Sequence, residues 1–361
     1  MRGLLIAAGG TGGHVFPAMA VGAAWQRLYP EKPLWWVGRP GGREEGWVAS
    51  LGVPYASIPS AGWQRQKPWR NLALLYKLPL GYYQLRRLFR QWPVGVVFTT
   101  GGYPGLMPGW IAHQRKVPLA LLELNSTAGR TIRWLAPHAQ VVFSAFPDLE
   151  GVSPSAKVVW SGVPVRFVEA DRVRYTPEEA RVALGFEAKR PLILILGGSQ
   201  GSSTLNQMVV QALRWWGEEP VSILWQVGGD TPTLPATKAR IEMRPFITDM
   251  VAAYRAAVVV VSRAGGSTLG ELSWWGKAAV LVPSPYVAED HQRRNAAYYR
   301  LRGAALVVEE TEGPQLLAEA VLRLLWEAEQ REALEKAASA LSKPDAAFHI
   351  AQMLYQLAYE A

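Results

Sequence analysis

One pattern occurs twice in the sequence: an apolar run, a glycine-rich segment and the start of a helix. The first copy joins an apolar run at residues 4–8 to residues 9–14, which read GGTGGH. The second joins an apolar run at residues 191–196 to residues 197–202, which read GGSQGS. A glycine turn between a buried strand and a helix is typical of doubly wound α/β domains. The repetition predicts two such domains in one chain.

Other short apolar runs alternate with helical segments through both halves of the chain. We expect further strands over residues 34–37, 94–99, 119–122, 141–143, 222–227, 257–262 and 279–282. The expected boundary near residues 161–164 gives an N-terminal domain over 1–162 and a C-terminal domain over 163–345. The last helix, residues 346–361, has an apolar stripe and is expected to join the N-terminal domain. The predicted fold class is α/β, with two doubly wound, Rossmann-like domains facing an interdomain cleft.

Composition limits the chemistry that suits this chain. Of its 361 residues, 49% are hydrophobic and 19% are charged, which is enough apolar material for two cores. The absence of cysteine excludes disulfides and thiolate chemistry. Residues 91–114 carry no Lys, Arg, Asp or Glu, but they include five glycines and three prolines. A helix interrupted that often would leave backbone groups unsatisfied in lipid, so this segment does not predict a membrane span.

The net charge of +9 is concentrated in the first half of the chain. Residues 1–162 contain 17 basic and 6 acidic residues, whereas the remainder contains 21 and 23. Within residues 63–92, aromatic side chains are interspersed with basic ones, and an apolar set recurs at helical spacing: Leu78, Tyr82, Leu85 and Phe89. A basic amphipathic segment of this kind suits an anionic membrane interface. Single-stranded nucleic acid and an ordinary core-facing helix are the alternatives.

The first glycine segment has features of a phosphate-binding turn. It lacks the Gly-Lys-Ser/Thr of a P-loop. The second expected strand ends near Arg39 instead of the acidic residue of an NAD site, so an NADP-dependent oxidoreductase remains an alternative. His14, where the turn enters a helix, suits a general base near neutral pH. A histidine here can equally be a hydrogen-bonded loop residue, and the turn can serve packing alone.

The second half holds further polar loops. Residues 262–268, which read SRAGGST, open a helix where Thr268 and nearby N–H groups suit a diphosphate. Glu271 lies one turn later, where its carboxylate can accept from two ribose hydroxyls or interact with the helix dipole. Residues 289–295 suit sugar hydroxyls or a solvated helix start. Neither an Asp-x-Asp pair nor a zinc-like histidine spacing occurs, so no metal site is predicted.

Together these segments resemble the MurG family over nearly the whole chain. The matching motifs are residues 9–18, 101–103, 125 with 128–129, 161–166, 197–201 with 205–206, 246–247 with 249–250, 263–271, and 290–292 with 295. Their order and spacing carry the resemblance. The family commonly has His and Gln where this chain has Leu122 and Leu124, so two polar groups expected near the cleft are replaced by leucine.

The resemblance implies a GT-B fold and an inverting glycosyltransferase without a catalytic metal or other cofactor. The family transfers N-acetylglucosamine from UDP-N-acetylglucosamine to the muramoyl sugar of undecaprenyl-linked lipid I, which forms lipid II for peptidoglycan. His14, Thr11 and Glu271 are the catalytic residues that it implies. The implied donor contacts are Ile247 with the uracil, Glu271 with the ribose, Ser199 and Thr268 with the diphosphate, and Gln292 with the sugar. Further implied donor contacts are Thr11, Gly12, Gly13, Asn125 and Arg166.

The resemblance also concerns the acceptor and the membrane. The residues expected on that side are Tyr103, Arg86, Arg87, Phe89 and Arg90. The expected partners are UDP-N-acetylglucosamine, lipid I and an anionic membrane surface, without nucleic acid. The expected location is peripheral, on the cytoplasmic face of the plasma membrane. A related UDP-sugar glycosyltransferase with another lipid acceptor and an NADP-dependent oxidoreductase are the alternative functions.

Overall fold

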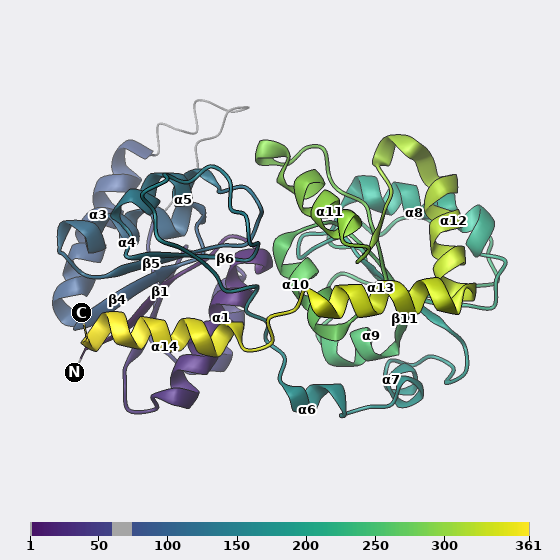
Figure 1. The fold of residues 1–361 in the computed structure, drawn as a ribbon, viewed down its shortest axis with the longest axis horizontal. Helices are drawn as coiled ribbons and strands as arrows, with labels where there is room; N and C mark the ends of the chain where they lie inside the picture. Colours follow the sequence, from purple (N-terminus) through teal and green to yellow (C-terminus); the bar gives the residue numbers. More distant parts are fainter. Residues whose placement is uncertain (1, 60–73, 361) are drawn as a thin grey trace. The chain divides into compact units, whose positions relative to one another are not determined.

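The computed structural model describes residues 2–59 and 74–360 and divides the chain into two compact units. The first unit comprises Met1–Arg166 together with Lys343–Ala361, and the second comprises Phe167–Ser342. Figure 1 shows the C-terminal helix, in yellow, beside the purple N-terminal segment. The boundary was expected after residue 162, whereas the first unit extends to Arg166. Gly162, with a φ of +75°, packs against the side chain of Lys343 inside the first unit.

The first unit is built on a parallel sheet in the order β3-β2-β1-β4-β5-β6-β7, within its described residues. The strands are β1 (Gly3–Ala7), β2 (Leu34–Gly38), β3 (Tyr55–Ser57), β4 (Val94–Thr99), β5 (Leu119–Glu123), β6 (Val141–Ser144) and β7 (Val158–Trp160). Strand order reverses between β1 and β4, which pair directly. The carboxyl ends of these two strands therefore form the topological switch point where doubly wound sheets bind ligands.

Helices cover both faces of this sheet (Figure 1). They are α1 (Gly12–Leu28), α2 (Glu44–Val48), α3 (Leu74–Gln91), α4 (Gly102–Gln114), α5 (Arg130–Leu135) and α14 (Ala346–Tyr359). Helices α1 and α14 bury one face, and their Tyr29 and Tyr355 rings stack at 4.1 Å. Helices α3, α4 and α5 bury the other face. The C-terminal helix thus completes the core of the first unit.

The second unit has a parallel sheet in the order β10-β9-β8-β11-β12-β13. Its strands are β8 (Leu192–Leu196), β9 (Ser222–Gln226), β10 (Arg240–Arg244), β11 (Ala257–Ser262), β12 (Ala279–Leu281) and β13 (Leu306–Val307). Its helices are α6 (Glu169–Arg172), α7 (Pro177–Ala183), α8 (Ser203–Trp216), α9 (Met250–Ala256), α10 (Gly266–Trp275), α11 (His291–Leu301), α12 (Gly313–Trp326) and α13 (Ala328–Ala340). Order reverses between β8 and β11, so this sheet has a switch point of its own.

The prediction of two doubly wound α/β domains is confirmed. Every strand expected from an apolar run is present, with bounds within one or two residues of those expected. Four short strands were missed, namely β3, β7, β10 and β13. They lie at the edges or ends of the sheets and are only partly buried, so they lack a continuous apolar run. None of the described helices is both long enough and apolar enough to cross a membrane.

Candidate functional site

The first glycine segment leaves β1 at the switch point of the first sheet. Gly10 adopts a φ of +98°, in the left-handed region that favours glycine, which allows the chain to turn sharply into α1. Thr11 is the N-cap residue of α1, and its side chain makes no capping hydrogen bond. Gly12 and Gly13 form the first turn of the helix. The N–H groups at this helix start lie at the carboxyl edge of the sheet, as a ligand-binding turn requires.

His14 is tied to the neighbouring strand by two hydrogen bonds. Its Nδ1 lies 2.8 Å from the backbone oxygen of Thr100, which directly follows β4. The Thr100 hydroxyl donates in return to the backbone oxygen of His14 over 3.0 Å. A carbonyl oxygen can only accept, so Nδ1 must carry the proton of the neutral ring. Nε2 then holds the lone pair, as a general base needs.

A glycine turn at residues 101–102, after β4, brings Tyr103 to the same edge of the first sheet. Gly101 and Gly102 have φ values of +85° and +69°, so both require the freedom of glycine. A Cβ atom on Gly102 would lie 4.0 Å from Cδ2 of His14, which places this turn beside the histidine ring. Tyr103 follows in the first turn of α4 and is 50% exposed. Its phenol is therefore available to a ligand at this edge.

Glu123 ends β5 as a buried carboxylate. It accepts from the backbone N–H groups of Asn125 over 2.9 Å and Gly129 over 2.8 Å, and from the Asn125 side-chain amide over 3.0 Å. Burial raises the pKa of the Glu123 carboxyl, and these hydrogen bonds partly offset the rise. Both carboxylate oxygens are engaged within the protein. Glu123 thus orients Asn125 and the start of α5, a role that the sequence analysis did not foresee.

Leu122 and Leu124 are buried in the core of the first unit. Both were expected near the cleft, where leucine would remove polar contacts. Leu122 is fully buried, Leu124 is 4% exposed, and both lie in the core shared with α1 and α14. The two leucines therefore stabilise the core of the first unit.

A second buried carboxylate, Glu44, lies beneath the first glycine segment. Its Oε1 accepts from the N–H of Gly10 over 3.4 Å and the N–H of Arg39 over 3.3 Å. It also forms an ion pair with the Arg39 side chain, with 3.6 Å between Nε and Oε1. Glu44 is 1% exposed, so it fixes the turn from within. Arg39, the residue that left an NADP-dependent oxidoreductase as an alternative, forms its ion pair with this carboxylate.

Arg166 lies close to the same helix start. Its guanidinium stacks over the ring of Phe16 at 4.4 Å, and Phe16 in turn contacts the Trp47 ring at 4.9 Å. Phe16 follows His14 by two positions in α1. The first unit thus gathers Thr11, His14 and Arg166 around one end of α1.

In the second unit, a buried amide joins two of the expected donor contacts. Gln226, at the end of β9, donates from Nε2 to the backbone oxygen of Gly198 over 2.8 Å. Its Oε1 accepts from the N–H of Ile247 over 2.9 Å. Gln226 is 5% exposed, so water competes little for either bond. Ser199, beside Gly198, and Ile247 are therefore held at one edge of the sheet.

Arg263 cross-links three segments at this edge. Its guanidinium donates to the Ser202 hydroxyl over 2.7 Å and to the backbone oxygen of Val282 over 3.0 Å. It also forms an ion pair with Glu310 at 2.5 Å. The Arg263 and Glu310 side chains are 7% and 16% exposed. Ser202 caps α8, so the arginine connects the loop after β8 to the ends of β11 and β12.

Glu271 and Thr268 both lie on α10. Thr268 is half-buried in the first turn of that helix, and Glu271 follows one turn later. The Tyr254 hydroxyl donates to Oε2 of Glu271 over 2.9 Å. The buried Asn295 donates to the backbone oxygen of Ala264 over 3.0 Å and so holds the loop that precedes the helix. This arrangement aligns an N-terminal helix turn with a carboxylate, as a nucleoside diphosphate requires.

Gln292 lies in the first turn of α11, and a hydrogen bond fixes the orientation of its side-chain amide. Its Oε1 accepts from the N–H of Ser284 over 2.9 Å, which directs Nε2 as the donor end of the amide. Just before it, Glu289 and Asp290 adopt φ values of +60° and +50°, unusual for residues with side chains. Backbone strain of this kind is concentrated at ligand-binding loops. Gln292 can therefore donate a hydrogen bond to a sugar oxygen.

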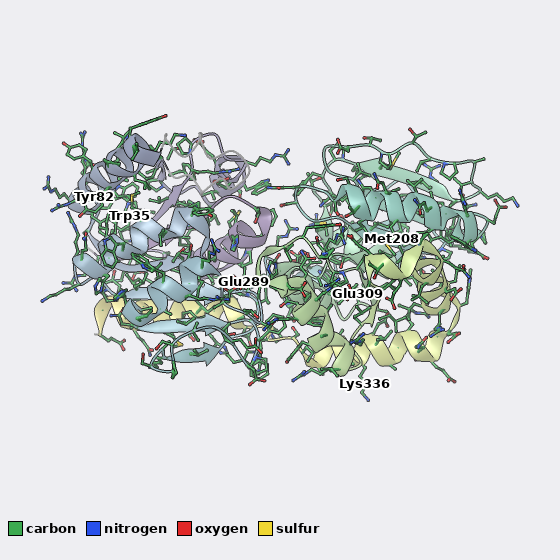
Figure 2. The ribbon with its side chains drawn as sticks, turned by 90° about the horizontal axis from the view of Figure 1, so that it is seen from above. Trp35, Tyr82, Met208, Glu289, Glu309 and Lys336 are labelled. Atoms are coloured by element: carbon green, nitrogen blue, oxygen red, sulfur yellow. The ribbon has the colours of Figure 1, made fainter. Side chains whose placement is uncertain are left out.

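Helix α3 presents basic and aromatic side chains at the surface of the first unit. Arg86, Arg87 and Arg90 line a depression of about 410 Å³ with Tyr82 and Tyr83. Figure 2 labels Tyr82 at this surface. Large exposed apolar and aromatic side chains continue along the helix, namely Leu75, Tyr76, Leu78 and Leu80. Phe89 is 8% exposed and packs in the core beneath, so it contributes no surface. Residues 60–73, including Trp63 and Trp69, lie outside the described part of the chain.

Models of a known enzyme family match both halves of the chain. The glycosyltransferase family 28 N-terminal domain matches residues 4–144, and the glycosyltransferase family 28 C-terminal domain matches residues 192–350. A Bacteroides fragilis protein named UDP-N-acetylglucosamine--N-acetylmuramyl-(pentapeptide) pyrophosphoryl-undecaprenol N-acetylglucosamine transferase is 34% identical, covering 99% of this chain and 96% of that protein. A Listeria welshimeri protein of the same name is 32% identical over 95% of this chain and 96% of its own length. The chain belongs to the MurG family.

A solved structure agrees with this assignment. The crystal structure of Acinetobacter baumannii MurG aligns with a TM-score of 0.72 at 28% identity, covering 99% of this chain and 100% of that chain. The calicheamicin glycosyltransferase CalG4 aligns with a TM-score of 0.66 at 14% identity, which bears on the fold alone. The two sheets described above therefore form the GT-B fold of the MurG family, as predicted.

The sequence motifs of this MurG family chain mark the loops of the site but not the buried side chains that hold those loops. Glu44, Gln226 and Tyr254 hold loops or carboxylates from buried positions. A polar residue ending an apolar strand, as Gln226 does, is the one signal that was available. Within residues 2–59 and 74–360, no group of three or more His, Asp or Glu side chains is arranged to hold a metal ion.

Proposed function

We propose that this chain transfers N-acetylglucosamine from UDP-N-acetylglucosamine to the muramoyl sugar of undecaprenyl-linked lipid I, forming lipid II for peptidoglycan. The observation that carries the proposal is the similarity, over nearly the full length of both chains, to proteins named for this transfer. The geometry supports it, because the expected donor residues and Tyr103 lie at the carboxyl edges of two switch-point sheets.

The donor is assigned mainly to the second unit. The backbone at Ile247 contacts the uracil, Glu271 accepts from the ribose, and Gln292 donates to the sugar. Ser199 and Thr268 hold the diphosphate, supported by the N-terminal turn of α10, where partial positive charge favours an anion. Further donor contacts are assigned to Thr11, Gly12, Gly13, Asn125 and Arg166. No catalytic metal takes part in this proposal.

His14 is assigned as the general base. Nε2 takes the proton from the acceptor hydroxyl while that oxygen forms a bond to the anomeric carbon of the donor. The bond from that carbon to the diphosphate oxygen breaks, and its electron pair leaves with UDP. One displacement of this kind inverts the anomeric centre. The hydrogen bond from Nδ1 to Thr100 supports the assignment because it fixes the tautomer that accepts at Nε2.

The protein is assigned to the cytoplasmic face of the plasma membrane as a peripheral protein. The surface of α3 supports this, since arginines and exposed aromatic side chains share one helix. Tyr103, at the edge that holds His14, is assigned to the acceptor. Each basic residue near an anionic surface contributes roughly 1 kcal/mol, so several must act together.

The decisive experiment measures sugar transfer from labelled UDP-N-acetylglucosamine to a short-chain analogue of lipid I. We expect a product one N-acetylhexosamine heavier by mass spectrometry, with inverted anomeric configuration by NMR. An acceptor that has the same lipid diphosphate but a different sugar serves as the control. Transfer to the control and not to the lipid I analogue would show that the chain uses another lipid acceptor.

A further inference from the structure

Glu271 receives a hydrogen bond from a buried tyrosine that no motif singled out. The Tyr254 hydroxyl donates to Oε2 of Glu271 over 2.9 Å. We propose that Tyr254 is a positioning residue that aims the Glu271 carboxylate at the two hydroxyls of a ribose, and so sets the preference for ribonucleotides. The inference rests on the proposed function, in which Glu271 contacts the ribose of the donor.

The Tyr254 ring is held in place from several sides. Its side chain is fully buried. The Phe167 ring packs edge-on against it at 5.9 Å, and the Trp275 ring lies nearly parallel to it at 6.0 Å. In a packed core a ring of this size cannot change rotamer without displacing its neighbours. The Tyr254 hydroxyl is therefore held in one position, beside Oε2 of Glu271.

Helix α9, which carries Tyr254, follows Ile247, the residue assigned to the uracil. Helix α9 begins three residues after Ile247, and Asp249 caps it by accepting from the N–H of Ala252 over 2.9 Å. Gln226 fixes the backbone of Ile247 just before it. The segment assigned to the nucleobase and the residue that orients the ribose-binding carboxylate thus belong to one short rigid element. Recognition of base and ribose is coupled through α9.

The chemistry of the pair gives a specific signature. An ionised carboxylate only accepts hydrogen bonds, and a phenol supplies one donor without cancelling the negative charge. The two hydroxyls of a ribose are donors that a carboxylate can accept. If Tyr254 acts through Glu271, its hydroxyl matters only for ligands that carry these hydroxyls. A general packing role would affect every uridine nucleotide alike.

The test is calorimetric binding of UDP and of 2′,3′-dideoxyuridine diphosphate to the full chain. We expect Tyr254→Phe to weaken UDP about tenfold, because one charge-assisted hydrogen bond is lost, and to leave the dideoxy ligand unchanged. Tyr299→Phe is the matched control. Tyr299 is also a buried tyrosine against α10, but its hydroxyl donates to the backbone oxygen of Leu269 over 3.0 Å. The control should leave the ratio of the two affinities at its wild-type value.

Three results would overturn the inference, and they differ from one another. Equal weakening of both ligands by Tyr254→Phe would make the hydroxyl merely structural. An unchanged affinity of that variant for UDP would show that Glu271 needs no positioning. If the wild-type chain itself binds both ligands equally, the proposed contact between Glu271 and the ribose is contradicted, independently of Tyr254. Should the phenylalanine variant not fold, Tyr254→Met, which fills an apolar gap flexibly, gives the same comparison.

Discussion

The carboxyl edges of the two sheets are built by different means. At the first edge, the buried Glu44 and Glu123 carboxylates each accept from two backbone N–H groups, and His14 is held through the backbone of Thr100. At the second edge, buried side chains cross-link the loops, with Gln226 joining two of them and Arg263 joining three. Side-chain cross-links hold a site ready before the ligand arrives. Both edges are therefore held from within, the first by buried carboxylates and the second by a buried amide and a buried guanidinium.

The largest expected effect would show that the first edge supplies chemistry. His14→Ala should lower kcat by about 10²–10⁴-fold, the usual contribution of a positioned general base, with little change in donor affinity. Steady-state kinetics with varied acceptor and calorimetry with UDP measure the two quantities. His113→Ala, an exposed histidine on α4, is the control. Near-normal kcat with a raised acceptor KM would instead make His14 a binding residue.

The second prediction tests the cross-links of the donor edge. Arg263→Met removes the buried partner of an ion pair, which typically costs about 3–5 kcal/mol, because Glu310 keeps the Thr204 hydroxyl but loses its opposite charge. Hydrogen exchange should accelerate at the amides of β8 and β11. Arg240→Met, in an exposed site on β10, is the control. Unaltered exchange would mean that the edge is held without this arginine.

The third prediction concerns the ligand contact that these cross-links serve. Glu271→Ala should weaken UDP binding by about 1.5–3 kcal/mol, the range for hydrogen bonds to a charged group. Calorimetry measures the loss, and Glu319→Ala, exposed on α12, supplies the comparison. A folded Glu271→Ala protein with wild-type affinity for UDP would remove the ribose assignment.

The smallest expected effect lies outside both edges, on α3. Arg86→Gln should weaken binding to anionic vesicles by roughly 1 kcal/mol or less, because a single charge near the surface contributes no more. Flotation with anionic and neutral vesicles measures it, and Arg214→Gln, exposed on α8, is the control. Equal binding of the wild-type chain to both vesicle types would reject the electrostatic attraction.

The sequence predicted what depends on local pattern and missed what depends on distant partners. The strands and glycine turns were visible because each is a continuous run with its own signal. The hydrogen bond between Tyr254 and Glu271 joins residues of two helices, and Gln226 reaches loops on either side of its strand. Such pairings follow from tertiary packing, which a single sequence does not reveal. The buried position of Phe89 has the same origin, because helical spacing gives a stripe but not which of its members face the core.

The placement of α14 has a consequence for how the chain is synthesised. The second unit is one continuous stretch, whereas the first needs the last nineteen residues, which bury Ile350 and Leu354 against α1 and the sheet. A ribosome delivers residues in order, and domains usually mature from the N-terminus onward. In this protein the unit begun first can be completed only after the second unit has been synthesised. Until then the part of the sheet face that α14 covers stays exposed, so apolar surface of the nascent chain remains open throughout the synthesis of the second unit.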